Sequence, residues 1–533
     1  MKTAISKTQM LLATMAVVAL LLAATAAYAA APGITGGTTN TFNLTAQPAY
    51  ITQPDGEMTY SWGYGCTGGT ASGFAPATTT TPFCNTMQVP GPTLIVTEGQ
   101  SVTVNLTNGL PTSAGNTSIL FPGFQVTSPA GSGVAGLLTQ EAAPGGTVTY
   151  TFTAGSPGTR AYYSGTQGDL QVEMGLYGAI IVLPSTTPTG CTALNNVPAH
   201  YVAPLNSPEA DFRLAPAAYD NPRTCYDREY LFQFSEMDPN IHRQALAQVT
   251  ARTGCTAGAP GCSLEVPTEP YHPAYFMING RSMPDDMDSN YAPQYPHQPY
   301  NGNPHMHPGE QVLLRIIGQG RWQHPFHEHG NHVRILGRDG NLILSSTNTG
   351  EINLAGPLLF TTTTTPGQAM DGIFYWTAKG LNWDAYGHNP TSTDPLAKLP
   401  CTPDANGYNT GAPTALNYYE WCQDHNKPLQ AMPFGDVAGN GPVTLPDPNL
   451  FTNGAWFGGS PYLGPDATVR ATGPTGTTPP SGTIANPPGS EAGFAFMWHS
   501  HNEREITTNN IFPGGMLMMM LVDSREFQID ESN

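Results

Sequence analysis

Short runs of alternating apolar and polar residues recur along this chain. In residues 101–106 and 147–152 every second residue is apolar, and residues 175–182 are almost continuously apolar. Successive side chains of a strand point to opposite faces, so an alternating run predicts a strand with one buried face. Glycine and proline separate these runs, which is typical of an antiparallel β-sandwich or barrel. The pattern therefore predicts an all-β fold.

The strand-like segments fall into two groups. The first predicts a domain over residues 42–185, and the second predicts a domain over residues 228–533. A Pro-rich linker over residues 186–227 separates them. Within the second domain, residues 384–490 are rich in Pro, Gly and Asn and contain two cysteines. We read this stretch as a loop-rich insertion tied by a disulfide and not as a third domain.

The amino terminus has the features of an export signal. Lys2 and Lys7 flank the start, residues 11–24 are apolar, and residues 27–29 form a cleavage site of the Ala-x-Ala kind. The apolar run is short for a membrane-spanning helix, and no later segment approaches the required length. We therefore predict a signal peptide over residues 1–29, no membrane span, and an exported protein in the periplasm or outside the cell.

The charge balance is acidic. The 533 residues include 38 Asp and Glu against 19 Lys and Arg, which gives a formal net charge of −19. Such a surface repels nucleic acid and anionic membranes, so neither is predicted as a partner. Charged residues make up only 11% of the chain, while Gly and Pro are abundant, which fits a β-rich extracellular protein.

Eight cysteines in an exported chain predict disulfides. Their spacing does not match a thiolate metal site, so structural cross-links in loops are the preferred interpretation. Eight cysteines permit about 105 pairings, and the pairing of sequence neighbours is only one of them. That pairing would give Cys66–Cys84, Cys191–Cys225, Cys255–Cys262 and Cys401–Cys422.

Two His-x-His pairs are the main candidates for a functional site. His327 and His329 lie in one β-like stretch, and His499 and His501 lie in another near the carboxyl end. Residues two apart on a strand point to the same face, so each pair presents two imidazoles to one side. If the two strands lie side by side, all four imidazoles converge on one spot. Four neutral imidazoles suit copper(II) and also zinc(II).

These motifs resemble the carboxy-terminal copper motifs of the multicopper oxidases, the family of laccases, ascorbate oxidases and bilirubin oxidases. The resemblance is most specific in residues 324–330, 499–516 and 175–182. It implies two cupredoxin-like Greek-key β-sandwich or barrel domains, where many family members have three. Two-domain relatives, including the copper nitrite reductases, commonly assemble as trimers, so a homo-oligomer is expected by analogy.

The resemblance also indicates that the copper motifs are degenerate. Family members hold a three-copper cluster with four His-x-His motifs, two in the first domain and two in the last. In the first domain of this chain the matching positions hold Leu120, Pro122, Tyr163 and Gly165. Leucine and proline cannot coordinate copper, and glycine has no side chain. A complete three-copper cluster is therefore not expected.

The separate blue copper site of the family is altered as well. Its first histidine and its axial methionine match His324 and Met516, which are further candidate ligands. The cysteine position holds Ser500, and the second histidine position holds Glu505. A serine hydroxyl cannot reproduce a soft copper–thiolate bond. The resemblance thus implies that this chain lacks the site that accepts electrons and has no blue absorption band.

Together these observations predict an exported copper-binding protein with fewer copper ions than an active multicopper oxidase. At most one mononuclear redox site is expected, on His327, His329, His499 and His501. Two alternatives stay open. One is a non-enzymatic secreted or surface structural protein on a cupredoxin scaffold. The other is an active multicopper oxidase with unusual ligands, some of them from a neighbouring subunit, so the sequence leaves enzymatic activity undecided.

Several other residues have two interpretations. Glu328 and Glu505 either orient imidazoles or serve as ordinary solvated or capping groups, and Tyr163 either donates its hydroxyl to the metal site or packs in a strand. Ser500 is a poor hydrolase nucleophile, because the histidines beside it point to the opposite face. One Pro-rich loop is either a copper-acquisition patch or an ordinary loop, and it contains His297, His305, His307, Met283, Met287 and Met306.

Overall fold

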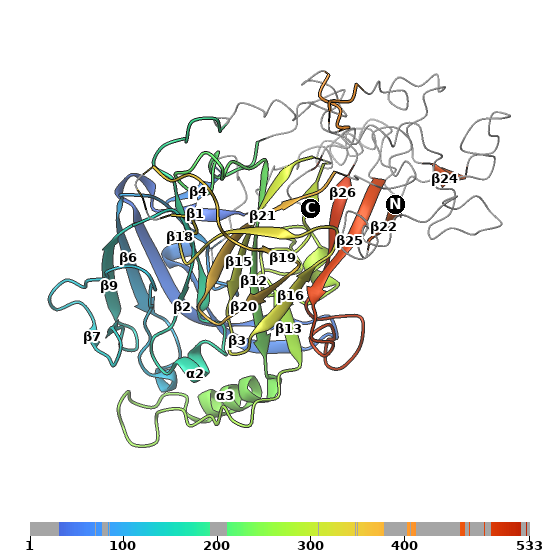
Figure 1. Cartoon of the computed structure of the whole chain (residues 1–533). Helices are drawn as coiled ribbons and strands as arrows, with labels where there is room; N and C mark the ends of the chain where they lie inside the picture. Colours follow the sequence, from blue (N-terminus) through green and yellow to red (C-terminus); the bar gives the residue numbers. More distant parts are fainter. Residues whose placement is uncertain are drawn as a thin grey trace, which may run out of the picture.

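Among the described residues of the computed structural model, nearly all the regular secondary structure is β-strand, which confirms the predicted all-β class. Figure 1 shows two neighbouring β-sandwiches, the first drawn in blue to teal and the second in green to red. No helix among the described residues is long and apolar enough to cross a membrane. The structure describes residues 31–69, 71–76, 84, 86–191, 211–307, 309–346, 348, 350–377, 402–405, 407–411, 459–463, 468–469, 484–485, 492–523 and 529.

The first sandwich packs a five-stranded sheet against a four-stranded sheet around one apolar core. A short hairpin of β7 (Val134–Ala135) and β8 (Gln140–Glu141) projects from it. In spatial order, the five-stranded sheet contains β10 (Gly158–Tyr163), β11 (Tyr177–Leu183), β5 (Leu94–Thr97), β1 (Gly33–Thr35) and β4 (Gly73–Ala75). The four-stranded sheet contains β3 (Met58–Cys66), β2 (Thr41–Thr52), β6 (Ser101–Asn108) and β9 (Thr147–Thr153).

The burial of these strands explains their sequence patterns. Along β6 and β9 buried residues alternate with exposed or half-buried ones, because one face of this sheet packs on the core and the other faces water. By contrast, β11 is buried at all but its last residue. Its sheet is covered on both faces, which accounts for the continuous apolar run. Strand β1 also belongs to this sheet, so the ordered strands begin before residue 42.

The second sandwich has the same two-sheet architecture, so both units fit the predicted cupredoxin-like fold. One sheet runs β13 (Tyr275–Ile278), β12 (Arg228–Met237), β15 (Gln311–Gly318), β21 (Ala369–Tyr375), β17 (Val333–Arg338) and β18 (Asn341–Leu342), with β19 (Leu358–Leu359) on β17. The other runs β14 (His305–Met306), β26 (Leu517–Asp523), β25 (Ala492–Ser500), β16 (His324–Glu328) and β20 (Thr361–Thr364), with β22 (Gly459–Leu463) on β25.

The predicted insertion lies mostly outside the described residues. Its described part nevertheless contributes β22, which pairs with β25, so the stretch adds a strand to the second sandwich. Strands β23 (Thr468–Val469) and β24 (Ile484–Ala485) pair with each other. Three of the four predicted disulfides are confirmed, Cys66–Cys84, Cys191–Cys225 and Cys255–Cys262. The predicted Cys401–Cys422 pair lies outside the described residues, as does the predicted signal peptide.

Buried charges join the two sandwiches. Asp371 on β21 accepts hydrogen bonds from the backbone and hydroxyl of Thr159 on β10, at 3.0 and 2.6 Å, and from the Tyr219 hydroxyl at 2.7 Å. Arg315 on β15 donates to Glu229 at 2.8 Å. Arg315 also lies 3.6 Å from Asp371, so this guanidinium compensates both buried carboxylates, as burial of charge requires. Apolar residues of both units, including Ile181 and Ile317, pack around the network.

Helices are few and short. In Figure 1 α2 (Gly168–Gln171) and α3 (Pro239–Ala251) lie at one end of the molecule, and single 3₁₀ turns occupy Gly37–Thr39, Thr67–Gly69, Thr112–Ala114 and Asp285–Met287. Asp238 caps α3, because its side chain accepts from the Asn240 backbone at 2.9 Å and Pro239 follows at the first helical position. Ile241 and Ala245 on this helix pack into the core of the first sandwich.

We expect Asp238→Ala to lower the free energy of unfolding by about 1–2 kcal/mol, because the amino-terminal backbone groups of α3 lose their acceptor. The second carboxylate oxygen also accepts from the His272 backbone at 2.9 Å, which favours the upper end of that range. Denaturant unfolding measures the change. Asp238→Asn keeps the capping oxygen and loses only the acceptor for His272, so it should lose less stability than Asp238→Ala, and an equal loss in both variants would contradict the capping role.

Candidate metal centre

Two adjacent strands of the second sandwich bring the His-x-His pairs together. Strands β16 and β25 are antiparallel neighbours, and their register places His327 directly opposite His499. The second histidine of each pair, His329 or His501, lies just past the end of its strand. The Trp498 indole donates to the His329 carbonyl at 2.9 Å and fixes the backbone there. The register therefore aligns the two pairs on one face of the sheet.

Three of the four imidazoles form a close group. The ligand nitrogens of His327, His329 and His499 all lie within 4.8 Å of one another, and all three residues are buried. The His329 Nε2 and His499 Nε2 atoms are 3.3 Å apart. With metal–nitrogen distances of about 2.0–2.1 Å, two imidazole nitrogens on one tetrahedral ion are separated by roughly 3.3 Å. The spacing of this His329–His499 pair thus fits a shared metal ion.

Hydrogen bonds orient two of these rings. His499 Nδ1 lies 2.7 Å from the Ser500 carbonyl, which can only accept, so the ring proton is on Nδ1 and the lone pair is on Nε2. His327 Nδ1 lies 2.8 Å from the Thr361 hydroxyl on β20. Metal-binding histidines usually have such a partner on the other ring nitrogen, because it fixes the ring orientation. Thr361 is a functional candidate that the sequence analysis missed.

The electrostatics of the group favour neutral imidazoles. Burial, followed by the fields of His329, His499 and His501, lowers the pKa of His327 to about 4. Burial also lowers the pKa of His499 below its ordinary value. A histidine must be neutral to donate its lone pair to a metal, so both rings are in the ligand form at neutral pH.

His501 stands at the rim of this group. Its ring centroid is 4.8 Å from that of His327 and 5.5 Å from that of His499, but its side chain is 54% exposed. Its backbone donates to the Pro325 carbonyl at 2.8 Å, which holds the chain beside β16. The structure therefore brings three of the four predicted ligands into one group and leaves the fourth close by.

We expect Thr361→Val to weaken metal binding about tenfold, because His327 loses the hydroxyl that orients its ring. Competition between the protein and a colorimetric chelator measures the affinity. Thr363→Val on the same strand is the matched control, since Thr363 is exposed and has the same change in side chain. Equal affinities in the two variants would show that Thr361 does not orient the ligand.

His324 occupies a different environment, although it begins the same strand. It is fully buried, and its Nδ1 and Nε2 atoms each lie 2.9 Å from a carboxylate, of Glu505 and Glu236 respectively. Burial alone would lower its pKa, but the hydrogen bonds to the two carboxylates outweigh that effect and raise the pKa to about 9. The raised pKa favours protonation of His324 at both nitrogens at neutral pH, a form that has no lone pair for a metal ion.

The residues around His324 complete an ionic network. The Ser500 hydroxyl donates to Glu505, and the backbone N–H groups of Arg321 and Trp322 donate to Glu236. Met516, the other candidate ligand at this place, is buried in the apolar core of the second sandwich. Glu505 therefore orients His324 and none of the grouped imidazoles. Glu236 is a second residue that the sequence analysis did not identify.

The remaining candidates are dispersed. Glu328 accepts from the Thr362 hydroxyl at 2.7 Å, and burial raises its pKa to about 8. In the Pro-rich loop, His305 pairs with Asp523 at 2.7 Å, and His297 bonds to the Met87 carbonyl at 2.8 Å. Across the described parts of the chain, His327, His329 and His499 are the only group of three or more His, Cys or carboxylate residues suited to a metal.

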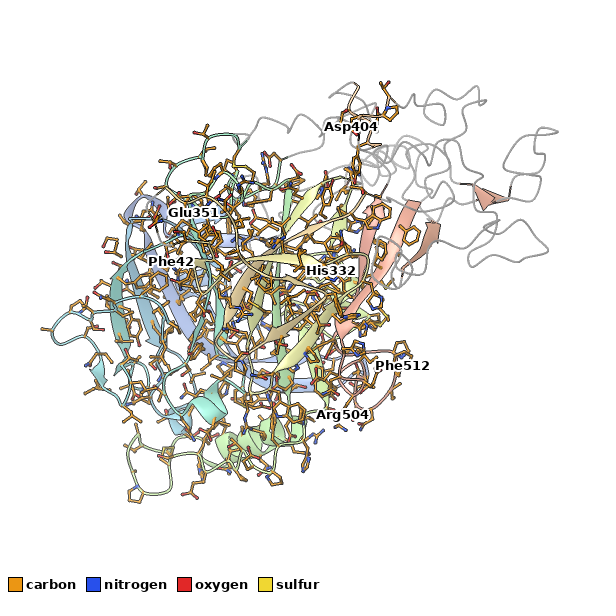
Figure 2. The ribbon with its side chains drawn as sticks, in the orientation of Figure 1. Phe42, His332, Glu351, Asp404, Arg504 and Phe512 are labelled. Carbon is orange, nitrogen blue, oxygen red and sulfur yellow. A yellow bond between two sulfur atoms is a disulfide. The ribbon has the colours of Figure 1, made fainter. Side chains whose placement is uncertain are left out.

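The chain surface beside the centre carries large apolar side chains. The Phe360 ring lies 5.7 Å from that of His327 and 5.2 Å from that of His332, and it is 45% exposed. Figure 2 shows Arg504 and Phe512 on the loop that follows β25, far from Phe42 in the first sandwich. The three buried imidazoles thus lie beside two exposed side chains, those of Phe360 and His501.

Comparison with known proteins points to one family. Two family models described as multicopper oxidase match residues 69–187 and 267–377. An L-ascorbate oxidase of Brassica rapa subsp. pekinensis is 41% identical over 96 residues, and the laccase abr2 of Aspergillus fumigatus is 37% identical over 98 residues. Each match covers 18% of this chain and only 16% of the relative's length.

Solved structures of similar fold carry related names. The blue copper oxidase from Nitrosomonas europaea aligns with a TM-score of 0.42 and 16% identity, over 90% of this chain and 85% of that chain. The copper nitrite reductase from Nitrosomonas europaea aligns with a TM-score of 0.35 and 18% identity, over 63% of this chain and 84% of that chain.

Proposed function

We propose that this chain, which belongs to the multicopper oxidase superfamily, binds a single copper ion at His327, His329 and His499. The observation that carries the proposal is the convergence of three buried imidazoles within 4.8 Å on two adjacent strands. Membership of the superfamily favours copper over zinc, for which the ligand set is also suitable.

The side chains around the group prepare it for a metal. Thr361 and the Ser500 carbonyl hold two of the rings by Nδ1, and the low pKa values keep these rings neutral. His501 is close enough to act as a fourth ligand after a rotation of its exposed side chain. Bound copper would supply one-electron redox chemistry at this position.

Electron delivery of the laccase kind is not part of the proposed function. The positions that resemble the blue copper site are occupied by the His324–Glu236–Glu505 network and by Ser500. In the first domain, Leu120 and Tyr163 stand at positions that match copper-binding histidines of the family, and neither offers an imidazole. We therefore propose copper handling or slow redox chemistry at one site, in an exported protein that has fewer copper ions than an active multicopper oxidase.

Metal analysis tests the proposal. The protein is loaded with copper(II), desalted, and examined for copper per chain, visible absorption and electron paramagnetic resonance. We expect about one copper per chain, a signal typical of imidazole ligands, and no intense thiolate-to-copper band. No bound copper would favour the structural role on a cupredoxin scaffold. Three or four copper ions would favour a working oxidase, with ligands supplied by a neighbouring subunit.

A further inference from the structure

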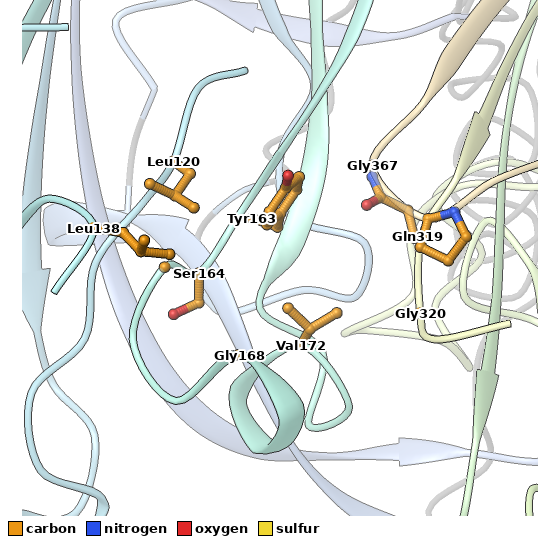
Figure 3. A pocket seen from close by; sticks show the side chains of 11 residues that line it. Leu120, Leu138, Tyr163, Ser164, Gly168, Val172, Gln319, Gly320 and Gly367 are labelled. Atoms are coloured by element: carbon orange, nitrogen blue, oxygen red, sulfur yellow. The ribbon is translucent and has the colours of Figure 1, made fainter.

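A cavity lies between the two sandwiches, apart from the metal centre. Its volume is about 320 Å³, and it is lined by Leu120 and Tyr163 of the first sandwich and by Gln319 and Pro366 of the second. This volume is within the range of small-molecule sites, and contacts between domains are a common place for them. Figure 3 shows Leu120 and Leu138 on one side of the Tyr163 ring and Gln319 on the other.

The walls are chiefly apolar and uncharged. Leu120, Leu138, Val172 and Pro366 supply apolar side chains, and no charged side chain lines the cavity among the described residues. One carboxylate close to the wall is already paired with a cation, because Glu236 lies 2.9 Å from His324. Glu236 lies directly behind Gly320, where its carboxylate would be 2.4 Å from an added Cβ atom. An ion of either sign would therefore lose its hydration in the cavity without gaining a free partner.

Two polar groups face each other across this space. None of the described residues forms a hydrogen bond with the Tyr163 hydroxyl, and the side chain is only half-buried. Gln319 is buried, and its amide nitrogen donates to the Gly178 carbonyl at 2.9 Å and to Gln233 at 3.1 Å. These two bonds use both amide hydrogens and leave the carbonyl oxygen of Gln319 as its acceptor.

We infer that this cavity binds a small uncharged organic molecule, one that accepts a hydrogen bond from Tyr163, donates one to Gln319 and places an apolar body against Leu120 and Val172. The ligand class follows from a wall that is apolar apart from Tyr163, Gln319 and the Ser164 hydroxyl, which already donates to Gln171 at 2.7 Å. The site is independent of the proposed function, because none of the four histidines lines the cavity.

Benzamide is a suitable probe, since its carbonyl accepts, its amide donates and its ring is apolar. Isothermal titration calorimetry with the full-length protein, with or without copper, should detect binding at millimolar concentration or below. Benzoate and benzylammonium have nearly the same shape and carry a charge. We expect at least tenfold weaker binding of both ions, because the cavity offers no compensating charge.

Two pairs of variants locate the binding. Gly168 lines the cavity, and a Cβ atom added there meets nothing within 4 Å, so we expect the ring of Gly168→Phe to fill the space and abolish binding. Gly155→Phe is the matched control, at an exposed glycine with equal room outside the cavity. Tyr163→Phe should weaken binding about fivefold through the lost hydrogen bond, whereas Tyr50→Phe should not change it.

The inference fails if benzamide does not bind, or if Gly168→Phe binds it as well as the wild type does. Preference for either ion over benzamide would overturn the uncharged ligand class. Retained affinity in Tyr163→Phe would overturn the role of its hydroxyl. Copper content is read separately in each variant, so failure of this site and failure of the metal centre are distinguishable.

Discussion

Replacing His329 and His499 together by alanine is expected to abolish copper binding, from about one ion per chain to none. The two Nε2 atoms are 3.3 Å apart and supply two of the three grouped imidazoles, so the double variant leaves His327 with only the half-exposed His501. A single remaining pair cannot enclose the ion. Copper per chain after desalting measures the effect, and the fold is checked by circular dichroism.

Two single variants show how the loss of copper binding depends on the position of the histidine. His501→Ala is expected to weaken copper binding about tenfold and not to abolish it, because that ring lies at the rim of the group. His332→Ala is the control, since His332 contacts Phe360 on the same surface but is outside the group. Unchanged copper content in the His329→Ala/His499→Ala variant would place the metal elsewhere and remove the basis of the proposed function.

Much of the fold could be predicted because the hydrophobic pattern reports burial directly. The alternation in residues 101–106 corresponds to β6 and its one-sided burial, and the apolar run in residues 175–182 corresponds to β11 between two packed layers. Strand β1 and strand β22 were missed. Both are short, and each is defined by pairing with a distant strand, β5 or β25, so no local pattern marks them.

The candidate site was partly predictable for a similar reason. Spacing of two along a strand is local information, so it indicates which histidines share a face. Register between β16 and β25 depends on the whole sheet, and only the structure shows that His327 lies opposite His499. Thr361 could not be identified, because it is the first of five consecutive threonines and nothing in that run distinguishes it.

The fate of His324 was the least predictable feature. The sequence marks Glu505 only as a candidate partner for imidazoles in general, and Glu236 is 88 residues away from His324. The structure shows a buried ionic network around His324. Ser500 supplies a hydroxyl donor to Glu505, two backbone N–H groups support Glu236, and His324 carries the positive charge between them.

Replacing His324 by glutamine is expected to lower the free energy of unfolding by about 3–5 kcal/mol near neutral pH, since two buried carboxylates lose their cation. The loss should depend on pH. The pKa of His324 is raised to about 9 in the folded protein from an ordinary value of 6.5. Its stabilising contribution is therefore complete below pH 6.5 and is lost as the pH rises through about 9.

Comparison of the wild type with the His324→Gln variant isolates the contribution of His324 to stability. Ionisation of Glu328 also destabilises the folded protein as the pH rises, because burial raises the pKa of this residue to about 8. This effect is common to wild type and variant and cancels in the difference. The stability difference should shrink by roughly 3 kcal/mol by about pH 10. Denaturant unfolding of the copper-free proteins across this range measures it, with His332→Gln as the control. A difference that stays constant with pH would show that His324 is not the buried cation of the network.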